Sequence, residues 1–138
     1  MTPATAFDAD VLIYAADPDH PLGPAIVKLI NSAPDGSPAG VGSVLLLTET
    51  LAKPMRTDPF STEVATLLDL LGRLTLRPVD EATGRAALDL AVSYGLRAAD
   101  AAHLATAIEA SADRFLTNNR RDFPKTITEI EIVYPEDL

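Results

Sequence analysis

The stretch that decides the fold is TAFDADVLIY, residues Thr5–Tyr14. A short apolar lead-in ends at Asp8, Asp10 follows two residues later, and an apolar run then resumes. This pattern predicts a strand that ends at Asp8 and a helix that begins just after it. Open α/β sheets place their ligands at the carboxyl ends of their strands, so Asp8 is a candidate functional residue. An aspartate between a strand and a helix is also a common helix cap, and both interpretations stay open at this point.

Outward from this stretch, short strands and amphipathic helices alternate along the chain. Further strands are predicted over residues 39–42, 74–79, 114–117 and 130–134, and helices over residues 10–16, 22–31, 43–53, 61–71, 80–95 and 98–110. Strands separated by helices predict an α/β/α sandwich with a mostly parallel central sheet.

Caps and apolar spacing define three of these helices more closely. Ser43, Ser61 and Asp80 are the predicted caps, and Pro54 predicts that the first of the three helices bends or stops near Lys53. Their predicted apolar faces are Val44, Leu47 and Leu51; Val64, Leu67, Leu68 and Leu71; and Leu88, Ala91 and Val92.

Length and composition limit the classes of protein to consider. We expect one domain over residues 1–138, since no repeat, long linker or low-complexity tract divides the chain. No apolar run approaches the ~20 residues that span a bilayer, and no basic segment followed by an apolar one indicates a secretory signal. The absence of cysteine excludes disulfides and thiolate metal sites and fits a reducing cytoplasm.

The charge balance is acidic, with 11 Lys and Arg against 20 Asp and Glu and a net charge of −9. Domains that bind nucleic acid are usually basic, because neutralising phosphates drives much of their affinity. The balance therefore argues against a nucleic-acid ligand, unless carboxylates hold cations that meet the phosphates. An acidic surface also fits a basic protein partner.

Several carboxylates fall where the predicted topology brings them together. Asp8 lies at a strand end, Glu49 inside a largely apolar helix, Asp100 in the first turn of an alanine-rich helix, and Asp122 in the loop after strand 114–117. A buried carboxylate needs a cation, a metal or hydrogen-bond donors.

Phosphodiester hydrolysis with divalent metal requires such a cluster, because carboxylates hold the ions and one ion lowers the pKa of the attacking water. Since the chain has no cysteine and only two histidines, the metal expected is oxygen-ligated Mg²⁺ or Mn²⁺.

Three segments carry a resemblance to a known family. FDADVLIYA at residues 7–15, DAAHLATA at 100–107 and FLTNNRRDF at 115–123, together with the helix that bears Glu49, resemble the PIN-domain ribonucleases over nearly the whole chain. The most similar subgroup is the VapC-type toxins of bacterial toxin–antitoxin pairs. The resemblance implies a PIN-like fold and a metal-dependent endoribonuclease that is often dimeric. It also implies inhibition by a small antitoxin protein with a basic DNA-binding part.

The family's metal-binding acids carry over to named positions. Asp8, Glu49 and Asp100 match three of them. Many members have Thr-Asn-Asp in the last motif, where this chain has Asn119 in place of the aspartate. Other members have Asn there and an aspartate before the phenylalanine, as Asp122 stands here. The resemblance therefore implies Asp122 as the fourth acid and Asn119 as a neutral ligand or water-holder.

Three further residues belong to the vicinity of this site. Thr117 resembles a hydroxyl residue that hydrogen-bonds near the metal in the family. Asp10 stands where Asn is common, so its extra charge is expected beside the metal ligands rather than among them. His103 lies one turn after Asp100 on an alanine-rich helix, and we interpret it as a core or supporting residue and not as a ligand.

Two alternative functions remain for comparison. A phosphatase of the HAD type also opens with a strand ending in Asp-x-Asp, but it needs a later acidic pair, and the chain offers only Glu136 and Asp137 near its end. The second alternative is a PIN-like module that binds RNA or protein without cleaving it, which Asn119 keeps open. Arg120, Arg121 and Lys125 either contact RNA phosphates or belong to a solvated loop.

Overall fold

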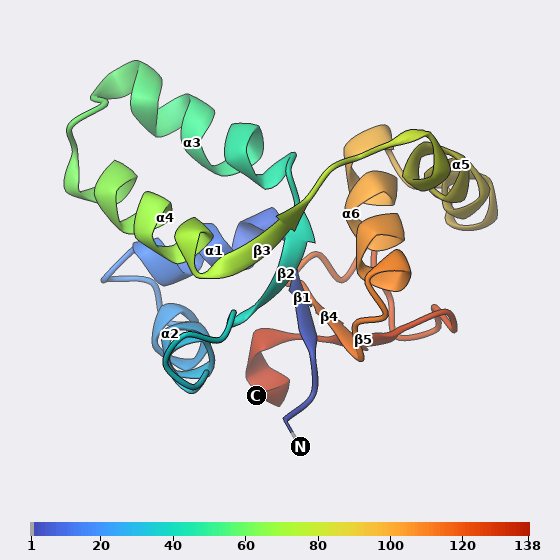
Figure 1. The fold of residues 1–138 in the computed structure, drawn as a ribbon, viewed down its shortest axis with the longest axis horizontal. Coiled ribbons are helices and arrows are strands. Elements are labelled where there is room, and N and C mark those ends of the chain that lie inside the picture. The colour runs from blue at the N-terminus through green and yellow to red at the C-terminus, as the bar shows by residue number, and fades with distance from the viewer. Residues whose placement is uncertain (1) are drawn as a thin grey trace.

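Five parallel strands form the centre of the molecule, with helices on both sides (Figure 1). The computed structural model describes residues 2–138. The strand order in the sheet is β3-β2-β1-β4-β5, so the first strand of the chain is the central one. The strands are β1 (Thr5–Phe7), β2 (Gly40–Ser43), β3 (Leu74–Arg77), β4 (Arg114–Leu116) and β5 (Glu131–Val133). The predicted α/β sandwich is confirmed, and all the strand pairs are parallel.

Every predicted helix is present. The helices are α1 (Ala9–Ala16), α2 (Gly23–Asn31), α3 (Leu46–Thr57), α4 (Thr62–Gly72), α5 (Glu81–Tyr94) and α6 (Ala98–Glu109), followed by the short 3₁₀ helix η1 (Pro135–Asp137). Figure 1 shows α1 to α4 on one side of the molecule and α5 with α6 on the other.

Alternation along the strands divides the core into two layers. Ala6 and Phe115 pack with α5 and α6, whereas their neighbours Phe7 and Leu116 pack with α1 to α4. Successive residues of a strand point to opposite faces, so three-residue strands suffice to hold both layers. The central position of β1 fixes Asp8 at the carboxyl edge of the sheet, immediately after Phe7.

The start of α3 differs from the prediction. Ser43 is the last residue of β2 rather than a helix cap, and its hydroxyl oxygen accepts a hydrogen bond from the Leu45 backbone. The Val44 N–H donates to the Arg77 carbonyl (2.9 Å), which continues the pairing of β2 with β3 and delays the helix until Leu46. Leu46 is therefore buried, and the predicted core residues Val44 and Leu47 are exposed.

Pro54 does not end α3, which continues to Thr57. The proline costs one backbone hydrogen bond, but the Asp58 N–H still donates to the Pro54 carbonyl (2.9 Å) and closes the final turn. Helix α3 packs against α4, and this packing supports the turn beyond the proline.

Ser61 and Asp80 do cap α4 and α5, but the buried faces of both helices differ from the prediction. In α4, Leu70 is buried and Leu68 is half exposed. In α5, Thr83, Ala87 and Leu90 are buried, whereas Leu88 is 63% and Val92 78% exposed. Small residues let α5 approach the alanine-rich α6 closely, and this contact outweighs the burial of two larger side chains.

The third predicted strand is also shorter than expected and ends at Arg77. Within residues 2–138, no helix has the length and apolar character needed to cross a membrane.

A pair of glycine variants tests the close packing of the central strands. A Cβ at Gly40 would overlap the Thr5 carbonyl oxygen and the Phe7 ring, whereas one at Gly84, inside α5, would meet no atom within 4 Å. Gly40→Ala is expected to lower the free energy of unfolding by about 1–3 kcal/mol. Gly84→Ala is expected to raise it by about 0.5–1 kcal/mol, because alanine favours helix.

Urea denaturation followed by circular dichroism measures both changes. The two variants share the entropic effect of Gly→Ala on the unfolded chain, so their difference isolates native packing. A Gly40→Ala protein as stable as Gly84→Ala would contradict the packing described here.

Candidate active site

Acidic side chains converge at the carboxyl edge of the sheet from separate elements. Asp8 ends β1 and caps α1, Glu49 lies in the first turn of α3, and Asp100 lies in the first turn of α6. Asp122 comes from the loop between β4 and β5. Parallel strands end at one edge, and right-handed crossovers start the following helices there, so residues distant in sequence become neighbours.

Asp8 is the most buried of these acids, with 5% of its surface exposed. Its Oδ1 accepts a hydrogen bond from the Ala9 N–H (2.8 Å), and its Oδ2 accepts one from the Thr117 hydroxyl (2.8 Å). Burial raises the pKa of Asp8 above its ordinary value, although the Thr117 hydroxyl, the charge of His103 and the Ala9 N–H oppose the rise. The carboxylate is thus held rigidly but is only partly compensated for its loss of water.

Glu49 and His103 face each other across the site. Nε2 of His103 lies 3.1 Å from Oε2 of Glu49, and the histidine side chain is fully buried whereas the Glu49 side chain is 32% exposed. Burial lowers the pKa of His103, but contact with Glu49 and the charges of Asp8 and Asp100 raise it by more, so the net change is upward. In the metal-free protein, the acidic cluster therefore favours the protonated form of His103.

Asp100 lies within electrostatic reach of the other acids. Its pKa is raised, first by burial and then by the negative charges of Asp8, Asp122 and Glu49. Asp122 accepts a hydrogen bond at Oδ2 from the Asn119 side-chain amide (2.9 Å), and its N–H donates to Asn119 Oδ1 (3.3 Å). Asp122 and Asn119 are the two candidates for the fourth metal-binding position of the family, and the structure shows that they are hydrogen-bonded to each other.

Asp10 lies beside the cluster and is anchored to the β4–β5 loop, since its Oδ2 accepts a hydrogen bond from the Asn118 N–H (3.0 Å). Its Oδ1 is buried and has no hydrogen-bond partner among residues 2–138. Burial, followed by the negative charge of Asp8, raises the pKa of Asp10 to about 7. Asp10 is thus a charged group that the surrounding structure leaves partly unsatisfied.

The cluster lacks basic partners. Among residues 2–138, no Lys or Arg forms an ion pair with Asp8, Glu49, Asp100 or Asp122, and His103 is the single cationic neighbour of Glu49. One ligand atom each from Asp8, Glu49 and His103 lies within 4.8 Å of the others, which is close enough to hold one ion. Converging carboxylates without a Lys or Arg partner, two of which (Asp8 and Asp100) have raised pKa values, fit a divalent cation.

Two of the three cations of the β4–β5 loop are engaged elsewhere. Arg120 pairs with Glu136 (2.6 Å) and Lys125 with Asp137 (2.7 Å), and both lie over the ring of Tyr134. The Tyr134 hydroxyl donates to the Phe123 carbonyl (2.9 Å), so the loop is also fastened to the residue that precedes η1. The Glu136 and Asp137 pair that a phosphatase would need therefore serves to hold this loop.

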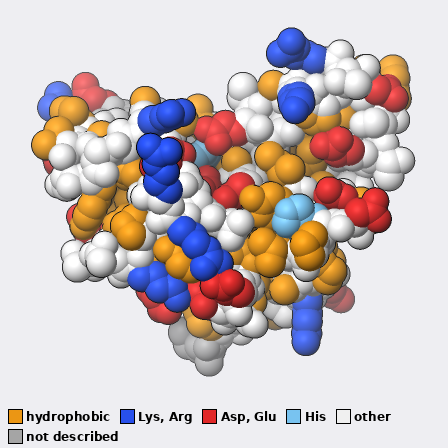
Figure 2. Space-filling model, turned by 180° about the vertical axis from the view of Figure 1, so that it is seen from behind, with side chains coloured by type: hydrophobic (Ala, Val, Ile, Leu, Met, Phe, Trp, Pro, Cys, Tyr) orange, Lys and Arg blue, Asp and Glu red, His pale blue; other side chains and the backbone are white. Residues whose placement is uncertain are grey.

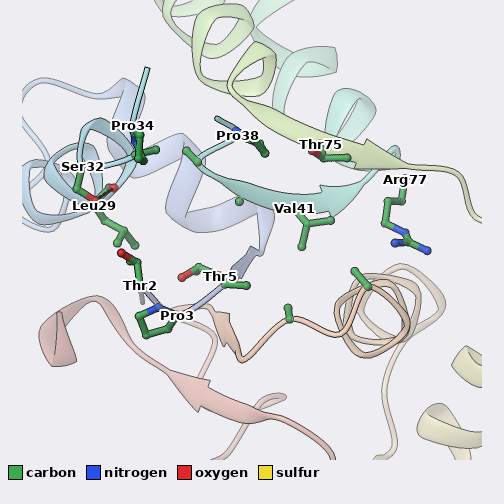
Figure 3. Close-up of a pocket in the computed structure, with 16 residues that line it drawn as sticks. Thr2, Pro3, Thr5, Leu29, Ser32, Pro34, Pro38, Val41, Thr75 and Arg77 are labelled. Atoms are coloured by element: carbon green, nitrogen blue, oxygen red, sulfur yellow. Dashed lines mark hydrogen bonds between the residues drawn. The ribbon is translucent and has the colours of Figure 1, made fainter. Parts of the chain in front are cut away.

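The surface is hollowed beside the acidic cluster. Figure 2 shows acidic side chains in a depression between two lobes of the molecule, with Lys and Arg side chains on both lobes. A separate cavity of about 430 Å³ lies at the opposite edge of the sheet, near the starts of β1 and β2 (Figure 3). Its lining includes Thr5, Val41 and Arg77 and contains no carboxylate, so this cavity is distinct from the acidic cluster.

Comparison with known proteins identifies the fold family. The sequence model of the PIN domain matches residues 6–127, which is most of the chain. The chain belongs to the PIN domain family. A search of curated proteins finds no match.

Two solved structures share the architecture of this PIN domain. A toxin–antitoxin complex from Klebsiella pneumoniae superposes with a TM-score of 0.74 at 21% identity, covering 98% of this chain and 99% of that chain. The structure of FitAB bound to the IR36 DNA fragment superposes with a TM-score of 0.69 at 18% identity, covering 97% and 96%. At these identities the likeness shows a common fold.

Sequence reasoning located the acids of this PIN domain but missed the contact of His103 with Glu49. Asp100 and His103 are three residues apart on α6 and so share one face of the helix, which was the available signal. The pattern gave no indication that Glu49 of α3 lies opposite that face.

The buried charge of Asp10 leads to a pH-dependent prediction for the metal-free PIN domain. The pKa of Asp10 is about 7 in the folded protein, against an ordinary value of 3.8 for an aspartate in water. The folded state holds the proton of Asp10 more tightly than the unfolded state does. The contribution of this proton to the free energy of unfolding is therefore complete below about pH 4 and is lost as the pH rises through about 7. Asp10→Asn removes the ionisation and should stabilise the protein increasingly over that range, by at most about 4 kcal/mol.

Chemical denaturation with EDTA at pH 5.5 and pH 8 measures the effect. Asp89→Asn, at an exposed acid on α5, controls for the loss of one surface charge. A gain for Asp10→Asn that is equal at the two pH values would show that Asp10 does not titrate in this window.

Proposed function

We propose that this PIN domain is a metal-dependent endoribonuclease that uses Mg²⁺ or Mn²⁺ and acts in the cytoplasm as the toxin of a toxin–antitoxin pair. The observation that carries the proposal is the acidic cluster of Asp8, Glu49, Asp100 and Asp122, in which Asp8 is buried and which has no Lys or Arg partner within residues 2–138. Such a cluster costs stability in the metal-free protein, and a bound divalent cation offsets that cost.

In the proposed reaction, Asp8, Glu49, Asp100 and Asp122 would hold the metal, which would supply an activated water and stabilisation of the leaving oxygen. Thr117 and the Ala9 N–H fix both oxygens of Asp8, which sets the direction in which its remaining lone pairs point. Asn119 orients Asp122 through its side-chain amide, which gives the amide a role although it carries no charge.

The acidic surface is compatible with RNA if the site itself provides the positive charge. The net charge of −9 repels phosphates at long range. Basic side chains on both lobes beside the depression (Figure 2) and the cation within it supply the local attraction. Arg120 and Lys125 are less suited to this role, because Glu136 and Asp137 already neutralise them.

A basic protein partner accounts for the rest of the acidic surface. The similar structures include a toxin–antitoxin complex and FitAB on a DNA fragment. By analogy we expect a homodimer and a small antitoxin with a basic DNA-binding part. Copurification with the product of a neighbouring reading frame would test this partner.

Single substitutions test the nuclease. Asp8→Asn, Glu49→Gln and Asp100→Asn keep the size of each side chain and remove one charge. Each is expected to lower RNA cleavage by at least about 100-fold, because a metal ligand is lost. Cleavage is measured on total RNA with Mn²⁺ by sequencing the RNA ends, together with growth arrest on expression.

Asp89→Asn on the exposed face of α5 is the matched control and should cleave as wild type does. If all three site variants retain wild-type cleavage, the nuclease proposal is wrong. If the wild type binds RNA without cutting it, the non-catalytic PIN-like module is the better description.

Asp122 and Asn119 are distinguished by a second pair of variants. Asp122→Asn should lower cleavage by at least about 100-fold if Asp122 is the fourth acid. Asn119→Ala should lower it by about 10-fold, since it removes the hydrogen bond that orients Asp122. The reverse order of these two effects, measured in the same assay, would assign the position to Asn119.

A further inference from the structure

The two histidines of the chain have very different surroundings. His20 stacks on Tyr14 with 3.9 Å between ring centroids, and its Nδ1 accepts a hydrogen bond from the Leu22 N–H (3.1 Å). The His103 side chain is fully buried, and neither of its ring nitrogens has a hydrogen-bond partner of suitable geometry among residues 2–138. A buried imidazole without a hydrogen-bond partner is costly even beside Glu49, and a missing ion is one explanation for it.

The open nitrogen of His103 faces the acidic cluster. A ring nitrogen of His103 and carboxylate oxygens of Asp8 and Glu49 all lie within 4.8 Å of one another. Two ligands on adjacent corners of an octahedral ion, with bonds of about 2.1 Å, are about 3 Å apart. The 3.1 Å between His103 Nε2 and Glu49 Oε2 equals this separation, although the pair does not meet the angular requirements of a hydrogen bond.

We propose that His103 is a direct metal ligand together with Asp8 and Glu49, and that this nitrogen makes the site prefer Mn²⁺ to Mg²⁺. The inference rests on the metal site of the proposed function. Mg²⁺ takes oxygen ligands and keeps several waters, whereas imidazole binds first-row transition ions more readily. A site with carboxylate ligands alone lacks the nitrogen ligand that gives this preference for Mn²⁺.

The competing explanation is that His103 only orients Glu49 from behind. In that arrangement the imidazole donates to Glu49 and never contacts the ion. The two arrangements differ in one measurable property, because only a coordinated imidazole transfers unpaired spin density from Mn²⁺ to its nitrogen.

Pulsed electron paramagnetic resonance on the full chain with bound Mn²⁺, free of any affinity tag, measures that property. We expect coupling to the ¹⁴N of a coordinated imidazole in the wild type and in His20→Gln, and loss of the coupling in His103→Gln. The chain contains only two histidines, so the His20→Gln control assigns the signal without ambiguity.

Two results overturn the inference in different ways. Mn²⁺ that binds without nitrogen coupling shows that His103 is not a ligand, and leaves the acidic metal site of the proposed function standing. Failure of Mn²⁺ to bind at all removes that metal site, and this inference with it.

Calorimetric titration tests the preference itself with the metals alone. His103→Gln offers an amide oxygen in place of the nitrogen, so Mn²⁺ affinity should fall about 10-fold or more and Mg²⁺ affinity less than about 3-fold. Equal losses for the two metals overturn the preference. Circular dichroism shows whether the variant folds, and if it does not, the wild-type resonance spectrum decides the question alone.

Discussion

The structure depends on a concentration of negative charge that its own side chains do not neutralise. Asp8 ends the central strand and is almost fully buried, with only the Ala9 N–H and the Thr117 hydroxyl bonded to its carboxylate. Burial and mutual repulsion raise the pKa values of Asp8, Asp10 and Asp100 together. Such repulsion opposes folding, and in the proposed function a bound cation would offset it.

Helix starts supply the compensation that Lys and Arg do not. Asp8 caps α1, Glu49 lies in the first turn of α3, and Asp100 lies in the first turn of α6. The first turn of a helix carries partial positive charge, and each such placement favours a carboxylate by about 0.3–1 kcal/mol. Three helix starts at one edge therefore lower the cost in stability of placing these carboxylates together. No basic side chains, which would compete with a metal, are needed for this.

The sequence predicted those features that depend on local pattern. The strand ending at Asp8, the parallel sheet and the presence of every helix followed from alternation, caps and apolar spacing. The predictions that Val44 and Leu88 are buried were wrong, because tertiary contacts determine which face of each helix is buried. Pairing of β2 with β3 delays the start of α3, and the close packing of α5 on α6 leaves Leu88 exposed. The contact between His103 and Glu49 joins two helices and leaves no local trace in either segment.

Electrostatics also constrains the proposed function. A phosphodiester approaching the depression meets the carboxylates of Asp8, Glu49, Asp100 and Asp122 on a molecule with a net charge of −9. At effective dielectric constants near 20, each unit charge about 4 Å away contributes about 4 kcal/mol of repulsion. Two loop cations, Arg120 and Lys125, are held by Glu136 and Asp137 and offset that field less than free cations would. In the proposed function, a bound cation would offset this repulsion and, with the basic side chains beside the depression, would attract a phosphate to this edge of the sheet.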